Sequence, residues 1–244
     1  MSKALPAIGF NPRPRIETLR FDAQASCLVV DDALLDPDAL RRYATARRGD
    51  FVQAPFNAYP GIELPMPLEF SARLQDFFDR HIRNALGGRR TVKMNSRLAM
   101  VTTPANALEP RQRICHRDSA WIDPAQTIAA SVLYLFEDET LGGTNFYRPR
   151  LPEDSIRQLV HDSSLMDRPG FDARYPSIAQ DYMRESNDYF ERIGQVPARW
   201  NRMIFYDGRL FHSGEVGNPK ALSGDPHAGR LTLNGFFTCS RPAG

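Results

Sequence analysis

The side chains best suited to chemistry are two histidines and an aspartate. His116 and Asp118 are two residues apart, and in a β-strand side chains at this spacing point to the same face. His212 lies in a second strand-like segment that ends at Gly214. Two imidazoles and one carboxylate leave three metal positions open, which suits a non-haem Fe(II) that binds a cosubstrate and O₂. On spacing alone, three unrelated barrel residues that make ordinary hydrogen bonds are an equally good interpretation.

Two other residues compete for roles in this site. His227 lies in a loop of Gly, Asp and Pro residues, so we prefer His212, whose flanks are strand-like, as the third ligand. Cys115, next to His116, has the chemistry of a thiol nucleophile, but a small residue packed in a strand is the better interpretation.

Composition and charge are those of an ordinary globular protein. Of the 244 residues, 42% are hydrophobic and 25% are charged, and the net charge is +2. This balance excludes a largely disordered or collagen-like chain. It gives no support to bulk electrostatic binding of nucleic acid or of a membrane. The sequence leaves the oligomeric state open.

The cellular compartment is inferred from the cysteines and from the apolar segments. The three cysteines are far apart and odd in number, which favours a reducing compartment. The longest uncharged apolar-rich run, residues 124–136, is too short to cross a bilayer, and the first ten residues do not have the pattern of a signal peptide. We therefore expect a soluble, cytoplasmic protein.

Two helices are predicted before the ligand pair. Asp36 is in the N-cap position of the first, with Pro37 at the first helical position and Gly49 just past the end. The second is predicted over residues 69–86, where apolar residues recur at helical spacing until a Gly-Gly pair stops the helix.

The rest of the chain has the pattern of β-strands. One strand precedes the helices, and about eight follow them: 26–30, then 91–103, 114–118, 127–136, 144–147, 188–196, 201–206, 210–214 and 230–238. We predict an extended arm over residues 1–25 and a single domain over 26–244, with an insertion at about 149–188. The expected fold is α+β, mainly β, dominated by a barrel or sandwich.

The order of these motifs resembles that of the Fe(II)/2-oxoglutarate-dependent dioxygenases, particularly the prolyl-4-hydroxylase-like branch. The matching segments are the first strand and helix (26–40), the ligand pair (116–118), a core strand and glycine turn (131–136 and 142–146), the approach to the third ligand (196–206 and 210–212) and the last strand (230–232). The insertion and the 215–229 loop match nothing in the family.

The resemblance implies a double-stranded β-helix, a jelly-roll or cupin-like barrel, with flanking N-terminal helices. It also implies a hydroxylase that couples substrate oxidation to decarboxylation of 2-oxoglutarate, with His116, Asp118 and His212 as the Fe(II) ligands. Arg230 offers a fork-shaped cation for the distal carboxylate of 2-oxoglutarate, and Thr232 shares its face of the strand. Tyr134 looks like the family's tyrosine that donates its hydroxyl to the same carboxylate.

Four further residues are candidates for contact with a substrate. Trp121 follows the ligand pair, Arg148 follows the glycine turn, and Asn95 and Arg97 share one face of the 91–103 strand. The substrate is an amino acid, a peptide side chain or a small metabolite, and the sequence does not choose among these.

Two other functions stay open at this point. In a halogenase, chloride replaces the carboxylate ligand, so the presence of Asp118 favours hydroxylation. The alternative of another class is a cupin-like metal binder or a non-catalytic β-helix protein that does not use 2-oxoglutarate. Such a protein has no need of a cation at Arg230, which favours the oxygenase.

Overall fold

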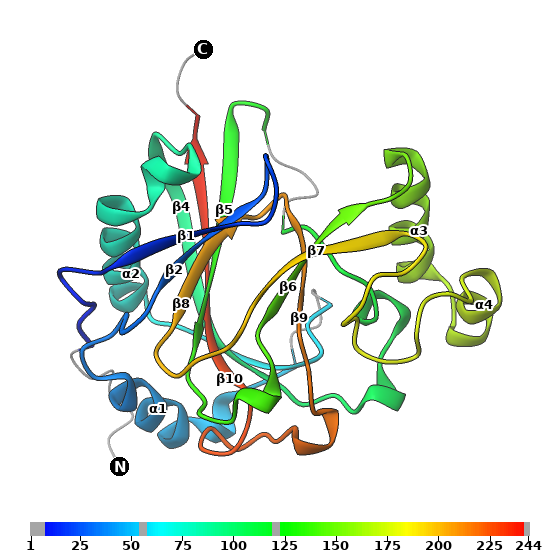
Figure 1. Ribbon diagram of the computed structural model, residues 1–244. Coiled ribbons are helices and arrows are strands. Elements are labelled where there is room, and N and C mark those ends of the chain that lie inside the picture. The colour runs from blue at the N-terminus through cyan, green and yellow to red at the C-terminus, as the bar shows by residue number, and fades with distance from the viewer. Residues whose placement is uncertain (1–7, 54–57, 119–122, 242–244) are drawn as a thin grey trace.

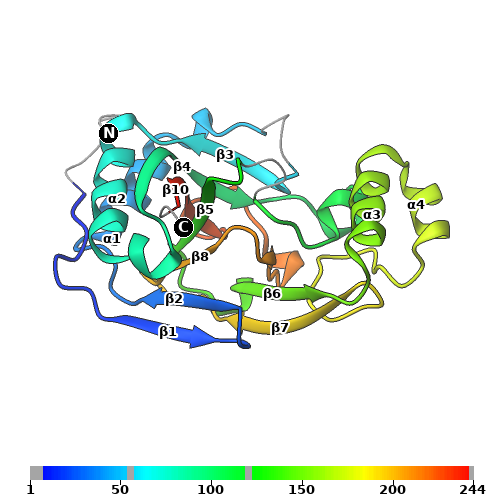
Figure 2. The same ribbon diagram turned by 90° about the horizontal axis from the view of Figure 1, so that it is seen from above.

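Two antiparallel β-sheets facing each other form the centre of the molecule (Figures 1 and 2). The computed structural model describes residues 8–53, 58–118 and 123–241. Within these ranges one sheet has seven strands and the other has three, with no closed barrel between them. The fold is therefore α+β and mainly β, as the sequence predicted.

The larger sheet has the strand order β1-β2-β8-β5-β10-β4-β3. In that order the strands are Ile16–Arg20, Ser26–Val30, Met203–Asp207, Gln126–Tyr134, Leu231–Ser240, Arg90–Val101 and Gly61–Pro65. The smaller sheet has the order β7-β6-β9, with strands Phe190–Val196, Thr144–Pro149 and Phe211–Gly214. The last two strands of the chain, β9 and β10, thus lie in different sheets.

Strand β10 shows how the two faces of the larger sheet differ. Leu231, Leu233 and Phe237 are fully buried and pack in the core that contains the helices. The alternate residues Thr232 and Asn234 face a cavity on the side of the smaller sheet. Alternation along one strand therefore separates a structural face from a polar one.

The first two helices cover the structural face, as Figure 2 shows. Helix α1 spans Pro37–Ala46, and the Asp36 carboxylate accepts a hydrogen bond of 2.9 Å from the backbone N–H of Ala39, which confirms the predicted N-cap. Helix α2 spans Leu68–His81. Both α-helices end earlier than predicted, because a 3₁₀ turn follows each: Arg48–Asp50 after α1 and Arg83–Leu86 after α2.

Three strand predictions differ from the structure. Residues 16–20, expected in an extended arm, form β1 and pair with β2. Strand β3 was not predicted, because its short segment lies between prolines and forms a sheet edge. The segment 114–118 is not a strand; it joins the smaller sheet by one bridge, between His116 and His212.

The 149–188 segment contains two helices at one end of the molecule (Figure 1). Helix α3 spans Glu153–Leu165 and α4 spans Arg168–Arg174. They share an apolar core with Phe190 of β7 and Phe211 of β9. This segment is thus packed onto the smaller sheet.

Every helix in the described part of the chain is too short or too polar to cross a lipid bilayer.

Candidate metal centre

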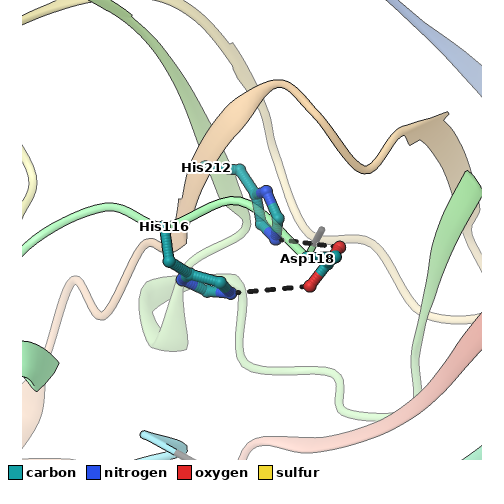
Figure 3. A group of neighbouring side chains, drawn as sticks. All are labelled: His116, Asp118 and His212. Carbon is teal, nitrogen blue, oxygen red and sulfur yellow. Dashed lines mark ion pairs between the residues drawn. The ribbon is translucent and has the colours of Figure 1, made fainter. Parts of the chain in front are cut away.

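His116, Asp118 and His212 converge on one point (Figure 3). One ligand atom from each lies within 4.8 Å of the others. Nε2 of His116 is 3.7 Å from Oδ1 of Asp118, and Nε2 of His212 is 3.5 Å from Oδ2. These distances exceed those of hydrogen bonds, so the three side chains surround a common space without bonding to one another.

Backbone hydrogen bonds hold the three residues in place. His116 and His212 exchange two of them, with N···O distances of 3.0 and 2.9 Å, and the backbone N–H of Asp118 donates to the carbonyl of Gly208 at 2.8 Å. The ring Nδ1 of His212 lies 2.9 Å from the carbonyl of Leu210. A bond at Nδ1 orients the ring and leaves Nε2 available for a ligand bond.

Desolvation at the cavity wall favours the neutral form of both imidazoles. Desolvation lowers the pKa of His212 to about 4. The pKa of His116 is lowered too, by desolvation and then by the neighbouring His212, although 59% of its side chain is exposed. Neutral imidazoles are the form that binds metal ions.

The donor set fits a divalent metal ion. Oδ2 of Asp118 is buried and accepts no hydrogen bond from the described residues. Burying a carboxylate oxygen without a hydrogen-bond partner costs free energy, unless another group such as a cation interacts with that oxygen. Burial raises the pKa of Asp118, which is the cost that a bound cation would remove. Two imidazoles and a carboxylate are the ligand set of non-haem Fe(II).

The three residues line a cavity of about 800 Å³ between the sheets. This volume is typical of a site for a small molecule. Four other residues that the sequence predicted also line it: Asn95, Arg97, Arg230 and Thr232. Both members of the Asn95/Arg97 pair face the cavity because they are two residues apart on β4.

Arg230 is a buried cation that neutral carbonyl groups hold in place. Only 4% of the residue is exposed. Its Nε donates to the carbonyls of Leu141 and Gly142 at 3.1 and 3.2 Å, and Nη2 donates to that of Gly143 at 2.6 Å. No carboxylate in the described ranges forms an ion pair with it, and Nη1 makes no hydrogen bond there.

Tyr134 lies away from the cavity lining. It is fully buried between the sheets, and its hydroxyl forms a hydrogen bond of 2.8 Å with that of Thr144, which does line the cavity. The sequence did not indicate that two other tyrosines, Tyr59 and Tyr182, line it instead. Burial raises the pKa of Tyr59 to about 12 and also raises that of Tyr182, and the positive charge of Arg230 opposes both rises.

The other two substrate candidates differ in what the structure shows. Arg148 is 54% exposed, pairs with Glu191 at 2.9 Å and Asp22 at 3.5 Å, and is absent from the cavity lining. Arg148 lies near the end of β6, where these two carboxylates give its guanidinium partners outside the cavity, and the sequence pattern does not reveal such partners. Trp121 lies outside the described residues.

Several solved structures match this chain at low similarity. A prolyl-4-hydroxylase of Pseudomonas putida is 14% identical, with a TM-score of 0.44 over 91% of this chain and 95% of that chain. The non-heme alpha ketoglutarate dependent epimerase SnoN from nogalamycin biosynthesis is 13% identical, with a TM-score of 0.44 over 88% and 81%. An N-substituted L-amino acid dioxygenase of Burkholderia ambifaria is 12% identical, with a TM-score of 0.36 over 86% and 80%.

Among curated proteins there is no match. A family model covers most of the chain, from residue 12 to residue 237. The chain therefore belongs to the family described as "Family of unknown function (DUF6445)".

Proposed function

We propose that the protein is an Fe(II)- and 2-oxoglutarate-dependent oxygenase that hydroxylates a C–H bond, and that its two sheets form an open version of the double-stranded β-helix. One observation carries the proposal. His116, Asp118 and His212 converge on the wall of a cavity that also contains Arg230, a buried cation without a carboxylate partner in the described chain.

The metal ligands have separate tasks in this proposal. The two neutral imidazoles and the Asp118 carboxylate hold Fe(II), which supplies O₂ chemistry when bound. The paired backbone bonds of His116 and His212 keep the ligands in place whether or not the site is filled. Asp118 provides the negative ligand that a halogenase lacks, which favours hydroxylation.

The cosubstrate is held by Arg230 in this proposal. The distal carboxylate of 2-oxoglutarate needs a permanent cation, and a guanidinium binds carboxylates through parallel hydrogen bonds. Nη1 of Arg230 has no hydrogen bond within the described residues and is available for this purpose. Thr232 lies two residues on, lines the same cavity and adds a hydroxyl. A metal-binding protein that does not use 2-oxoglutarate gains nothing from burying this cation.

The test is iron-dependent formation of succinate. The full chain is loaded with Fe(II), bound iron is quantified, and succinate is measured with 2-oxoglutarate and O₂ present. Slow, uncoupled release above background is expected without the true substrate, and it should be lost in Asp118→Ala and His212→Ala. Arg157→Gln is the matched control, because Arg157 is 71% exposed and pairs only with Asp154 in the described chain. Iron-loaded protein that forms no succinate with a broad panel of amino acids and peptides would contradict the proposal.

A further inference from the structure

Arg97 is a second cation in the cavity of the candidate metal centre, and the chemistry proposed above does not use it. It lies on β4 opposite Asn234 of β10 and lines the cavity. Arg97 thus shares this cavity with the three candidate metal ligands.

Two contacts fix the position of this guanidinium. Nε is 2.6 Å from Oε1 of Glu63, a residue of β3 that is only 4% exposed. Cζ lies 4.5 Å from the centre of the Phe236 ring, in a cation–π contact. A side chain held in this way loses little conformational freedom when it binds a ligand.

The terminal nitrogens of Arg97 remain available. The contact with Glu63 is made by Nε, and neither Nη1 nor Nη2 donates a hydrogen bond to any described residue. Two such nitrogens form a planar fork that matches the oxygens of a carboxylate or a phosphate group.

The ionisable residues around the cavity are mostly cationic. Among the described residues that line it, Asp118 is the only carboxylate. Lys93 and Arg111 also line it, are exposed, and form no ion pair in the described chain. Lys93 is four residues before Arg97, about 13 Å further along the same face of β4 toward solvent. The positive charge thus extends from the exposed mouth to the metal centre.

We propose that the substrate is a small molecule with an oxyanion group, carboxylate or phosphate, which Nη1 and Nη2 of Arg97 bind. Lys93 and Arg111 attract the anion to the mouth of the cavity. The inference rests on the proposed oxygenase function, because it places the anionic end of the substrate in the cavity that contains the proposed Fe(II) ligands. The volume of the cavity favours a small molecule over a protein.

The test compares compounds that differ only in charge. The full chain, loaded with Fe(II) and 2-oxoglutarate, is given amino acids and N-acyl amino acids with their primary amides, and phosphate monoesters with their parent alcohols. Only anionic members should stimulate succinate release, and the two sets separate carboxylate from phosphate. Arg97→Gln should raise the concentration for half-stimulation at least about tenfold. Arg97→Lys should recover part of this loss, since it keeps the charge that Glu63 needs but not the fork. Arg157→Gln should behave as the wild type.

Two results would overturn the inference. One is that neutral compounds stimulate succinate release as strongly as their anionic counterparts, in both the wild type and Arg97→Gln. This result would leave the oxygenase proposal intact. The other is at least about tenfold weaker 2-oxoglutarate binding in Arg97→Gln, measured without O₂, which would make Arg97 the cosubstrate anchor. The inference predicts a change in that affinity of less than about twofold.

Discussion

Arg230 illustrates how a single buried charge indicates function. Removing a guanidinium from water is costly, and three carbonyl groups compensate for only part of that cost. A partner carboxylate would complete the compensation, and no described residue provides one. The missing negative charge therefore corresponds to the ligand that we propose, 2-oxoglutarate.

Replacing Arg230 by Ala should weaken 2-oxoglutarate binding selectively. Charge-assisted bidentate hydrogen bonds contribute about 1.5–3 kcal/mol, so the apparent constant for 2-oxoglutarate should rise at least about tenfold. Iron affinity should change much less, because Arg230 is not a ligand. Titrations of iron and of 2-oxoglutarate with both proteins test this. Equal losses in the two affinities would contradict the assigned role.

The sequence predicted the three candidate metal ligands more reliably than it predicted the other residues that line the cavity. The His-x-Asp spacing, the strand pattern around His212 and the family resemblance together selected three ligand candidates, and the structure brings them together although residues 114–118 form no strand. The place of Tyr134 depends on a hydrogen bond to Thr144 across the two sheets. Tyr182 lies in the 149–188 segment, where no periodic pattern indicates which side chains face the cavity.

At the level of elements, the turn before β6 positions Arg230. Gly142 has φ of +81°, a conformation that favours glycine, and a Cβ there would lie 2.2 Å from the carbonyl oxygen of Glu215. This turn supplies all three carbonyl acceptors of Arg230. The geometry of this turn thus affects both the stability of the folded protein and the position of the Arg230 guanidinium.

Gly142→Ala should destabilise the protein and weaken 2-oxoglutarate binding together. A positive φ combined with a ψ of 160° is essentially restricted to glycine and costs another residue about 1–3 kcal/mol, and the close contact with Glu215 adds to this cost. Gly49→Ala is the control, since a Cβ there meets nothing within 4 Å, and its effect should stay within about 0.5 kcal/mol. Urea unfolding and 2-oxoglutarate titration of both variants measure this. Equal free energies of unfolding for the two variants would contradict the role of the turn.

A helix with clear capping residues was predicted well, whereas the strands at the edges of the larger sheet were not. Helix α1 has Asp36 and Pro37 at its start, and the structure confirms both positions. Strand β1 at the edge of the larger sheet is largely exposed, so it lacks the apolar alternation that marks a half-buried strand. Its pairing with β2 is what makes it a strand.

At the scale of the whole molecule, ion pairs join segments that are distant in sequence. Asp31, after β2, is 2.6 Å from Nε of Arg202 and 3.1 Å from Nη1 of Arg199, near the start of β8. The hydrogen bond from Arg202 is the largest cause of the lowered pKa of Asp31. Partial burial opposes it, and the positive charges of Arg202 and Arg199 lower the pKa further. The two arginines thus favour its ionised form in the folded protein.

This lowered pKa gives a pH dependence with a defined sign. The folded protein binds this proton less readily than the unfolded chain, so the stabilisation is present above the unfolded pKa of about 3.9. It is lost as the pH falls through the lower, folded pKa. Asp31→Asn should therefore lower the unfolding temperature at neutral pH, and its difference from the wild type should shrink in acid. A difference independent of pH would contradict the role of this ion pair.

The fold class was predictable from the sequence, whereas the division of strands between the sheets was not. Strand type follows from local pattern, but the position of β10 between β4 and β5 depends on pairings that are distant in the chain. The cavity between the sheets is a product of those pairings. Local patterns therefore could not reveal that Tyr59 and Tyr182, from distant segments of the chain, line the same cavity.

The central claim is that one cavity binds Fe(II) and 2-oxoglutarate together, and anaerobic absorption spectroscopy tests it most directly. Adding 2-oxoglutarate to the iron-loaded full chain should produce a visible metal-to-ligand charge-transfer band, since the 2-oxo acid chelates the iron. The band should persist in Arg157→Gln, require more 2-oxoglutarate in Arg230→Ala, and be absent in Asp118→Ala and His212→Ala. Wild-type protein with one bound iron per chain and no band at saturating 2-oxoglutarate would contradict the claim.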